Sequence, residues 1–154
     1  MIMNKEQKKI VEKAVEFNCK MLSVEKPKIK YLNSTNFLSP TTQSAISEDF
    51  SSLGINTDIN FSMLDLWFVI SHEIRHLWQK NNKMYLSDYI SANKLETKKY
   101  NEQEAEIDAH AWAIVVITNL FGMRPTLEVN LGTEIWQKIL DRAEKISDEM
   151  MDVL

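Results

Sequence analysis

Residues 62–80 read SMLDLWFVISHEIRHLWQK, and the pattern HExxH falls within them, from His72 to His76. Residues four apart lie on one face of an α-helix, so His72 and His76 can direct two imidazole nitrogens at one point. A Zn²⁺ ion accepts such nitrogens at about 2.0–2.1 Å. Glu73 stands one residue further round the helix, where its carboxylate can act as a general base without binding the metal. The stretch therefore predicts a metal-binding helix.

The residues around the motif favour a buried helix. Residues 63–70 are apolar on almost every side, which is typical of a helix inside a small domain. Ser62 and Asp65 have the spacing of a capping box, with Asp in place of the usual Glu, and the helix is expected to end near Asn81. Two of the three histidines in the chain lie in this motif. The alternative is that they only pack or face solvent, so a third ligand is needed to support a metal site.

Size and charge limit the kinds of partner. The chain has 154 residues, of which 44% are hydrophobic, and this suits a single domain over residues 1–154. Its formal net charge of −4 argues against a nucleic-acid backbone as a direct partner, because phosphate binding needs clustered Lys and Arg. The first thirty residues are basic and residues 101–154 are acidic, which we interpret as a solvated surface with opposite poles.

Cysteine content and hydropathy indicate a compartment. Cys19 is alone, so no intramolecular disulfide can form, and a reducing compartment is the simplest setting. The N-terminal residues carry no apolar segment typical of a leader, and no run reaches the ~18 apolar residues that a membrane span needs. We therefore expect a cytoplasmic protein with no membrane partner.

The spacing of apolar residues and the breaks between them predict an α+β protein. Helices are expected over residues 4–22, 62–80, 101–120 and 133–151. Short strands are expected over residues 28–31, 44–47 and 53–61. Residues 81–100 show no sustained period and are expected to form a loop that rims a cleft. The predicted fold has about four helices and a three-stranded sheet packed on the HExxH helix.

A catalytic zinc site takes three protein ligands and keeps one position open, so a third donor must come from elsewhere in the chain. The predicted helix over residues 101–120 begins with a polar cluster of Glu102, Glu104, Glu106, Asp108 and His110. Small residues beside Glu106 would let a second helix approach closely enough for this carboxylate to reach a shared metal. Glu106 is therefore the first choice, and Glu104, Asp108 and His110 stay open as alternatives. Asp108 and His110 could instead orient a ligand.

Three tyrosines, Tyr85, Tyr89 and Tyr100, lie in the predicted loop over residues 81–100. A tyrosine hydroxyl can donate a hydrogen bond to a developing oxyanion. Tyr100 is the first candidate for this catalytic role because it lies nearest to the next predicted helix. The alternative is that all three tyrosines only pack.

Two motifs together resemble a known family. The first is HEIRH at residues 72–76, and the second is EIDAHAWA at residues 106–113. They resemble the gluzincin-type metallopeptidases, in particular the small ImmA/IrrE-like proteins of bacteria and their phages, whose second motif is close to ExxANxFA. Glu106 takes the place of the family's ligand Glu. Two positions depart from the pattern, because His110 stands where Asn or Asp is usual and Arg75 stands where Gly is common.

The resemblance implies a minimal zincin-like fold and a zinc-dependent metalloendopeptidase. Zn²⁺ would be held by His72, His76 and Glu106, with Glu73 as the general base. It also implies a protein or peptide substrate, with a transcriptional regulator as one candidate. Two alternatives stay open: a catalytically silent zinc-binding module that regulates or binds a partner protein, and a structural α+β protein without metal. The same ligands could hold Mn²⁺ or Fe²⁺.

Overall fold

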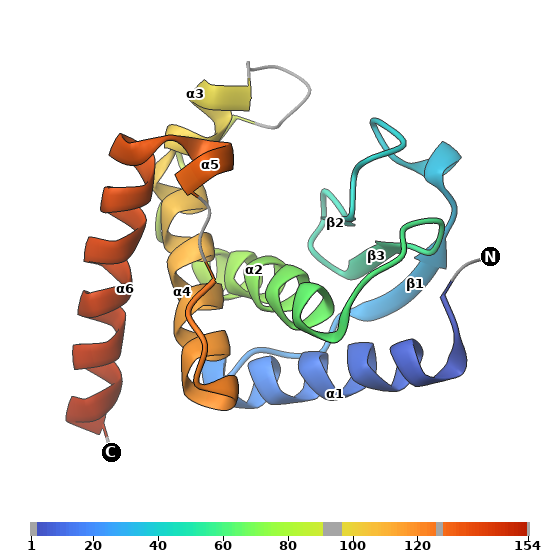
Figure 1. The fold of residues 1–154 in the computed structure, drawn as a ribbon, viewed down its shortest axis with the longest axis horizontal. Helices are drawn as coiled ribbons and strands as arrows, with labels where there is room; N and C mark the ends of the chain where they lie inside the picture. The colour runs from blue at the N-terminus through green and yellow to red at the C-terminus, as the bar shows by residue number, and fades with distance from the viewer. Residues whose placement is uncertain (1–2, 91–96, 126–127, 154) are drawn as a thin grey trace. The chain divides into compact units, whose positions relative to one another are not determined.

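The computed structural model describes residues 3–90, 97–125 and 128–153. Helices and three short strands are combined in an α+β fold, as predicted (Figure 1). The chain divides into two compact units, Met1–Trp78 and Gln79–Leu154, with the boundary in the last turn of the HExxH helix. None of the helices in the described ranges combines the length and the hydropathy that a membrane span needs.

The first helix, α1, runs over Lys5–Leu22 and confirms the predicted first helix. Its start is a capping box, in which the Asn4 side chain accepts from the Gln7 N–H and the Gln7 side chain accepts from the Asn4 N–H, both at 2.9 Å. Its inner face is apolar and includes Val11, Ala14 and Cys19. Burial raises the pKa of the Cys19 thiol to about 11, so this residue is an inert part of the core.

The sheet of the first unit has the strand order β1-β3-β2. Strand β1 (Lys28–Leu32) pairs in parallel with β3 (Ser52–Asn56), and β2 (Ser44–Ile46) pairs antiparallel with β3. All five residues of β3 are buried, as expected of a central strand. The three strands were predicted, and β2 leaves one edge of the sheet unpaired among the described residues.

The third strand ends earlier than its predicted limit at residue 61. Asn56 terminates it, because its side-chain oxygen accepts the Asp58 N–H at 3.0 Å and turns the chain. The Asn56 amide also donates to the Thr42 carbonyl at 2.9 Å, which fixes the residue between two segments. These side-chain bonds of Asn56 end strand β3. The apolar residues after Asn56 belong to the connection between β3 and α2.

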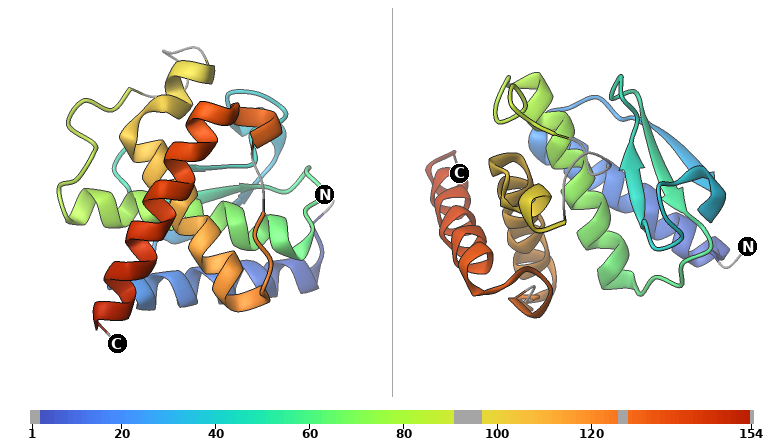
Figure 2. Two further views of the ribbon diagram at one scale, coloured as in Figure 1. Left: turned by 60° about the vertical axis from the view of Figure 1, so that its left-hand side comes forward. Right: turned by 90° about the horizontal axis from the view of Figure 1, so that it is seen from above.

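Helix α2 runs over Met63–Asn81 and carries the HExxH motif. Ser62 caps it as predicted, because the Ser62 N–H donates to the Asp65 carboxylate and the Asp65 N–H donates to the Ser62 hydroxyl, both at 3.1 Å. Within the first unit, α1 and the sheet both lie beside α2 (Figures 1 and 2). The Asn18 amide of α1 donates to the Ser71 hydroxyl at 3.0 Å, and this buried bond joins the two helices.

Strand β1 contains a side chain with an unsatisfied polar group. Among the buried side-chain atoms of the described residues, the Tyr31 hydroxyl has no hydrogen-bond partner. The Tyr31 ring lies under the ammonium group of Lys8, at 4.9 Å from the ring centroid. Phenylalanine would keep this cation–π contact and would remove the unpaired hydroxyl.

We therefore expect Tyr31→Phe to raise the free energy of unfolding by about 1 kcal/mol, because a buried hydroxyl without a partner costs desolvation energy. Chemical denaturation followed by circular dichroism measures this change. A loss of stability of similar size would mean that the hydroxyl is bonded in solution.

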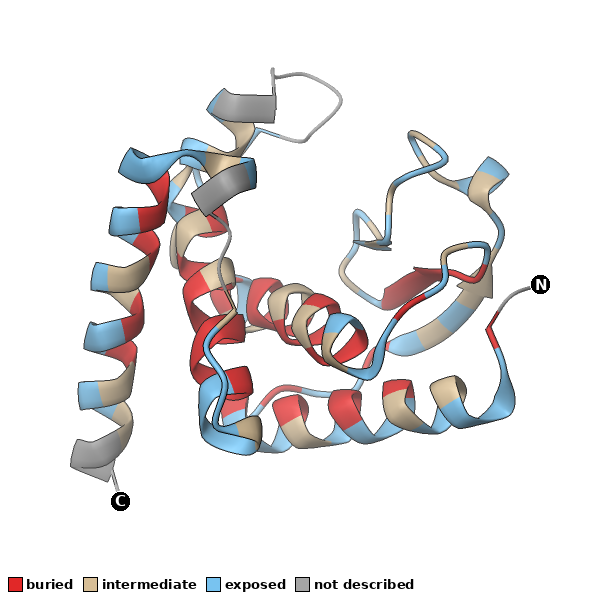
Figure 3. Ribbon diagram, viewed as in Figure 1, coloured by how far each residue is buried: buried red, intermediate tan, exposed pale blue. Residues whose placement is uncertain are grey.

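The second unit is built around helices α4 (Glu104–Phe121) and α6 (Thr133–Val153), which pack side by side (Figure 1). Helix α4 ends where Gly122 adopts φ 66°, as the sequence predicts for a residue that closes a helix. Buried residues of α6 face α4 (Figure 3), and they include Trp136, Ile139 and Ile146. These apolar residues of α6 are therefore part of the core of the second unit. Helix α5 (Glu128–Leu131) is a single turn before α6.

Two helices replace the predicted helix over residues 101–120. A short helix, α3 (Thr97–Glu102), precedes α4 and includes the last residues of the predicted loop, while residues 91–96 of that loop lie outside the described residues. Gln103 separates the helices with φ −63° and ψ 141°. Its side chain accepts the Ile90 N–H at 2.7 Å and donates to the Ile90 carbonyl at 2.9 Å, so a contact with the preceding segment breaks the helix.

Candidate metal centre

The two motif histidines are neighbours on α2. The His72 and His76 rings lie edge to face, with centroids 4.9 Å apart and an interplanar angle of 85°. His76 is buried, and His72 is partly exposed. Helix α2 therefore places both imidazoles on one face, as the spacing predicts. Both histidines belong to the first unit.

Glu73 orients one of these histidines. Its Oε1 lies 3.3 Å from His72 Nδ1, and a carboxylate accepts hydrogen bonds, so Nδ1 is the protonated nitrogen of the neutral ring. The lone pair of His72 is then on Nε2, which is the nitrogen that would bind a metal. The Ser44 hydroxyl of β2 donates to the same Oε1 at 3.2 Å. Ser44 was not singled out from the sequence, because nothing in the local pattern reveals that β2 reaches Glu73.

The acidic residues at the start of α4 differ in exposure. Glu102 and Glu104 are exposed, whereas Glu106 is 1% exposed. A buried carboxylate requires a compensating partner, and an exposed one at the first turn of a helix does not. Of the glutamates considered from the sequence, Glu106 is therefore the one whose environment fits a ligand.

Asp108 has strong structural partners. Arg142 Nε of α6 donates to its Oδ1 at 2.8 Å, and Gln79 Nε2 donates to its Oδ2 at 2.9 Å. Burial lowers the pKa of Arg142, but the hydrogen bond and the charge of Asp108 outweigh this effect and the net shift is upward. Arg142 therefore keeps its charge beside Asp108, and both oxygens of Asp108 are bonded within the second unit.

His110 is oriented by the backbone of its own helix. Its Nδ1 lies 2.7 Å from the Glu106 carbonyl oxygen, one turn earlier in α4. A carbonyl only accepts, so Nδ1 carries the proton and the lone pair of the neutral ring is on Nε2. Histidines that bind metals are commonly fixed in this way by a backbone carbonyl. His110 thus has the tautomer of a ligand.

The candidate tyrosines have different roles in the second unit. The Tyr89 hydroxyl donates to Glu106 Oε2 at 3.1 Å, and the Tyr100 hydroxyl lies 2.6 Å from that of Tyr89. Tyr85 adopts φ 66°, and its ring lies 5.9 Å from the Arg142 guanidinium. Tyr89 therefore bonds Glu106 directly, although proximity in sequence favoured Tyr100.

Arg75, which departs from the family pattern, is accounted for within the first unit. Its guanidinium stacks on the Trp78 ring at 3.6 Å from the ring centroid, and the residue is 3% exposed. Stacking on an aromatic face suits the planar guanidinium group. Arginine at this position therefore contributes to packing along α2.

These donors are chemically suited to a metal. The donors are the His72 imidazole in the first unit and, in the second unit, the Glu106 carboxylate and the His110 imidazole. Nitrogen and carboxylate donors suit Zn²⁺, and the same set accepts Mn²⁺ or Fe²⁺. His72 and His110 each bond an oxygen acceptor through Nδ1, as histidines that bind metals commonly do.

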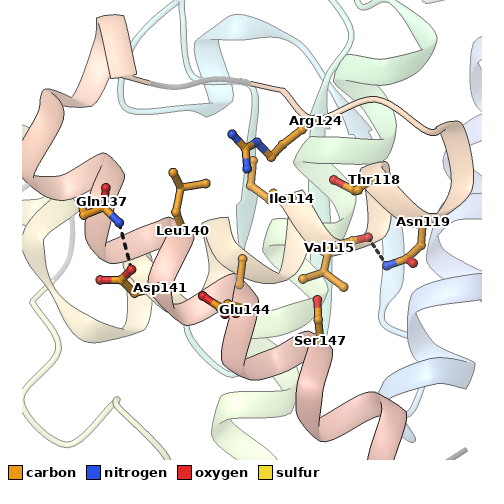
Figure 4. A pocket seen from close by; sticks show the side chains of 11 residues that line it. Ile114, Val115, Thr118, Asn119, Arg124, Gln137, Leu140, Asp141, Glu144 and Ser147 are labelled. Carbon is orange, nitrogen blue, oxygen red and sulfur yellow. Dashed lines mark hydrogen bonds between the residues drawn. The ribbon is translucent and has the colours of Figure 1, made fainter.

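A separate cavity of about 380 Å³ lies between α4 and α6 (Figure 4). Ile114 of α4 and Leu140 of α6 are among its apolar lining, and Arg124 is among its polar lining. Asp141, which also lines it, accepts a hydrogen bond from Gln137 at 2.9 Å. Within the second unit this cavity is therefore distinct from the donors Glu106 and His110, which do not line it.

Comparison with known proteins adds nothing to the family resemblance, which rests on the two sequence motifs. No protein-family model matches the chain, and neither a curated protein nor a solved structure matches it.

Proposed function

We propose that the chain is a zinc-dependent metallopeptidase of the gluzincin type, similar to the ImmA/IrrE-like proteins. The observation that carries the proposal is the orientation of the two candidate imidazoles. His72 and His110 each direct Nδ1 at an oxygen acceptor, which is how histidines that bind a metal through Nε2 are commonly oriented.

The zinc would be held by His72, His76 and Glu106, with His110 as an alternative or additional ligand. When bound, zinc supplies Lewis acidity, which polarises the scissile carbonyl and makes water more acidic. Glu73 takes the proton from the attacking water and delivers it to the leaving amine. The Ser44 hydroxyl keeps the Glu73 carboxylate in place through its 3.2 Å bond.

The substrate class follows from the position of β2. This edge strand carries Ser44 and could pair with an extended peptide, which would bring the peptide backbone next to Glu73. The family resemblance implies a cytoplasmic protein substrate, with a transcriptional regulator as one candidate.

The proposal predicts that the purified protein carries about one zinc ion per chain and cleaves members of a mixed peptide library. Removing the metal with a chelator should stop cleavage, and adding Zn²⁺ should restore it, because the reaction depends on the Lewis acid. Elemental analysis and mass spectrometry of the library measure the two results. Zinc-loaded protein that cleaves no peptide and no protein would exclude the peptidase.

A second candidate function is a catalytically silent zinc module that binds a partner protein. His110 favours it, because four ligands from His72, His76, Glu106 and His110 would fill a tetrahedral zinc and leave no position for water. The module predicts tight zinc binding without cleavage. It also predicts partner binding that survives Glu73→Gln.

A further inference from the structure

Three side chains of the second unit form a hydrogen-bonded chain. Tyr100 lies on α3, and Glu106 lies in the first turns of α4. Tyr89 belongs to the segment before α3 that is described up to residue 90. The Tyr100 and Tyr89 hydroxyl oxygens are 2.6 Å apart, and the Tyr89 oxygen is 3.1 Å from Glu106 Oε2. The two rings meet edge to face with centroids 5.9 Å apart, so both hydroxyls are held in place by packing.

The chemistry of the groups fixes the direction of these hydrogen bonds. A carboxylate only accepts, so Tyr89 must spend its single proton on Glu106. The Tyr89 oxygen can then only accept from Tyr100. The protons therefore point from Tyr100 to Tyr89 to Glu106, and bonds aligned in one direction polarise and strengthen one another.

The surroundings of Tyr89 favour the protonated form of its hydroxyl. Burial, the charge of Glu106 and the bond to Tyr100 all raise the pKa of Tyr89 above its ordinary value. These effects favour the protonated hydroxyl, which agrees with the donor role of Tyr89 toward Glu106. Its hydroxyl contacts one carboxylate oxygen of Glu106, Oε2.

We propose that Tyr89 and Tyr100 are positioning residues that hold Glu106 as a ligand through one oxygen. By occupying Oε2, Tyr89 would direct Oε1 to the metal and keep the coordination number low, and Tyr100 would act through Tyr89. This inference rests on the proposed metal site, since it assigns Glu106 as a ligand. In this inference Tyr100 donates its proton to Tyr89 and not to the substrate oxyanion.

The test is the Zn²⁺ affinity of the purified full chain with Tyr89→Phe, measured at neutral pH by competition with a chromophoric chelator. Losing a bond that orients a ligand commonly costs about 10–100-fold in metal affinity, and we expect a loss in this range. Tyr100→Phe should cause a smaller loss, because Tyr89 can still donate to Glu106. Tyr31→Phe is the matched control, since it removes a tyrosine hydroxyl from β1, and it should leave the affinity unchanged.

A second readout separates positioning from a general loss of structure. The ligand-field spectrum of the Co²⁺-loaded protein responds to coordination number, and it should change in Tyr89→Phe if Glu106 then binds through both oxygens. Thermal unfolding of the metal-free variants shows whether they remain folded. A folded Tyr89→Phe variant with wild-type zinc affinity and an unchanged cobalt spectrum would overturn the inference.

The outcomes also distinguish this inference from the proposed function. If wild-type protein binds zinc and cleaves peptides while Tyr89→Phe binds zinc equally well, the positioning role fails and the peptidase stands. If zinc binding weakens in Tyr89→Phe but wild-type protein cleaves nothing, the positioning role stands and the peptidase fails. Wild-type protein that binds no zinc overturns both. A Tyr100→Phe variant with lower kcat and intact zinc affinity would restore the oxyanion role for Tyr100.

Discussion

The Glu73→Gln variant is expected to keep zinc and to lose peptide hydrolysis. Glutamine has nearly the same size as glutamate, and its carbonyl oxygen can still accept the Ser44 hydroxyl and the His72 Nδ1–H. The orientation of His72 is then retained, so zinc affinity should stay near the wild-type value. An amide cannot take a proton from water, and losing a general base typically costs about 10²–10⁴-fold in rate. Peptide cleavage and zinc content measure the two effects in the same preparation.

Glu104→Gln is the matched control for this experiment. Glu104 is exposed at the first turn of α4, so the same chemical change there should alter neither zinc content nor cleavage. Cleavage by Glu73→Gln at the wild-type rate would remove Glu73 from the mechanism. Loss of zinc from Glu73→Gln would instead mean that Glu73 acts mainly by orienting His72, and the cleavage measurement would then need zinc-loaded protein.

Features set by short-range geometry could be predicted from the sequence. The helix spacing of His72 and His76 places their rings side by side, and the capping box of Ser62 and Asp65 forms as expected. Both depend on residues within four positions of one another. The same holds for Gly122 at the end of α4. The α+β class and the three strands followed from similarly local patterns of alternation and breaks.

Features set by contacts between distant segments could not be predicted in this way. Gln103 breaks a helical pattern because it bonds Ile90, and Asn56 ends a strand because it bonds Thr42 and Asp58. No local period shows which side chain a loop will meet. The same limit explains the site, where position along the chain favoured Tyr100 and folding places the Tyr89 hydroxyl on Glu106.

Asp108 illustrates how burial separates residues that look alike in the sequence. It was a candidate ligand together with Glu104 and Glu106, and the sequence pattern gave no means of excluding it. In the second unit its two oxygens accept from Arg142 and Gln79, and its side chain is 2% exposed. These contacts join α6 and the last turn of α2 to the second turn of α4. Asp108 therefore has the environment of a structural residue.

The Asp108→Ala variant is expected to lose about 3–5 kcal/mol of unfolding free energy, which is the usual cost of removing one partner of a buried ion pair. Arg142 would keep its charge without the carboxylate, and the buried Gln79 amide would lose one acceptor while keeping the Ala105 carbonyl at 2.9 Å. Chemical denaturation of the metal-free protein measures the change, so zinc binding does not contribute to it. Asp108→Asn should lose less, because its carbonyl oxygen can still accept one of the two bonds.

Asp141→Ala is the control for Asp108→Ala, because Asp141 is an exposed aspartate of α6 whose partner, Gln137, is also exposed. Its unfolding free energy should stay within about 0.5 kcal/mol of the wild-type value. Two outcomes for Asp108→Ala lead to different conclusions. A large loss of stability without metal makes Asp108 part of the packing between α4 and α6. Wild-type stability combined with loss of zinc would make Asp108 the third ligand and would remove the reason for choosing Glu106.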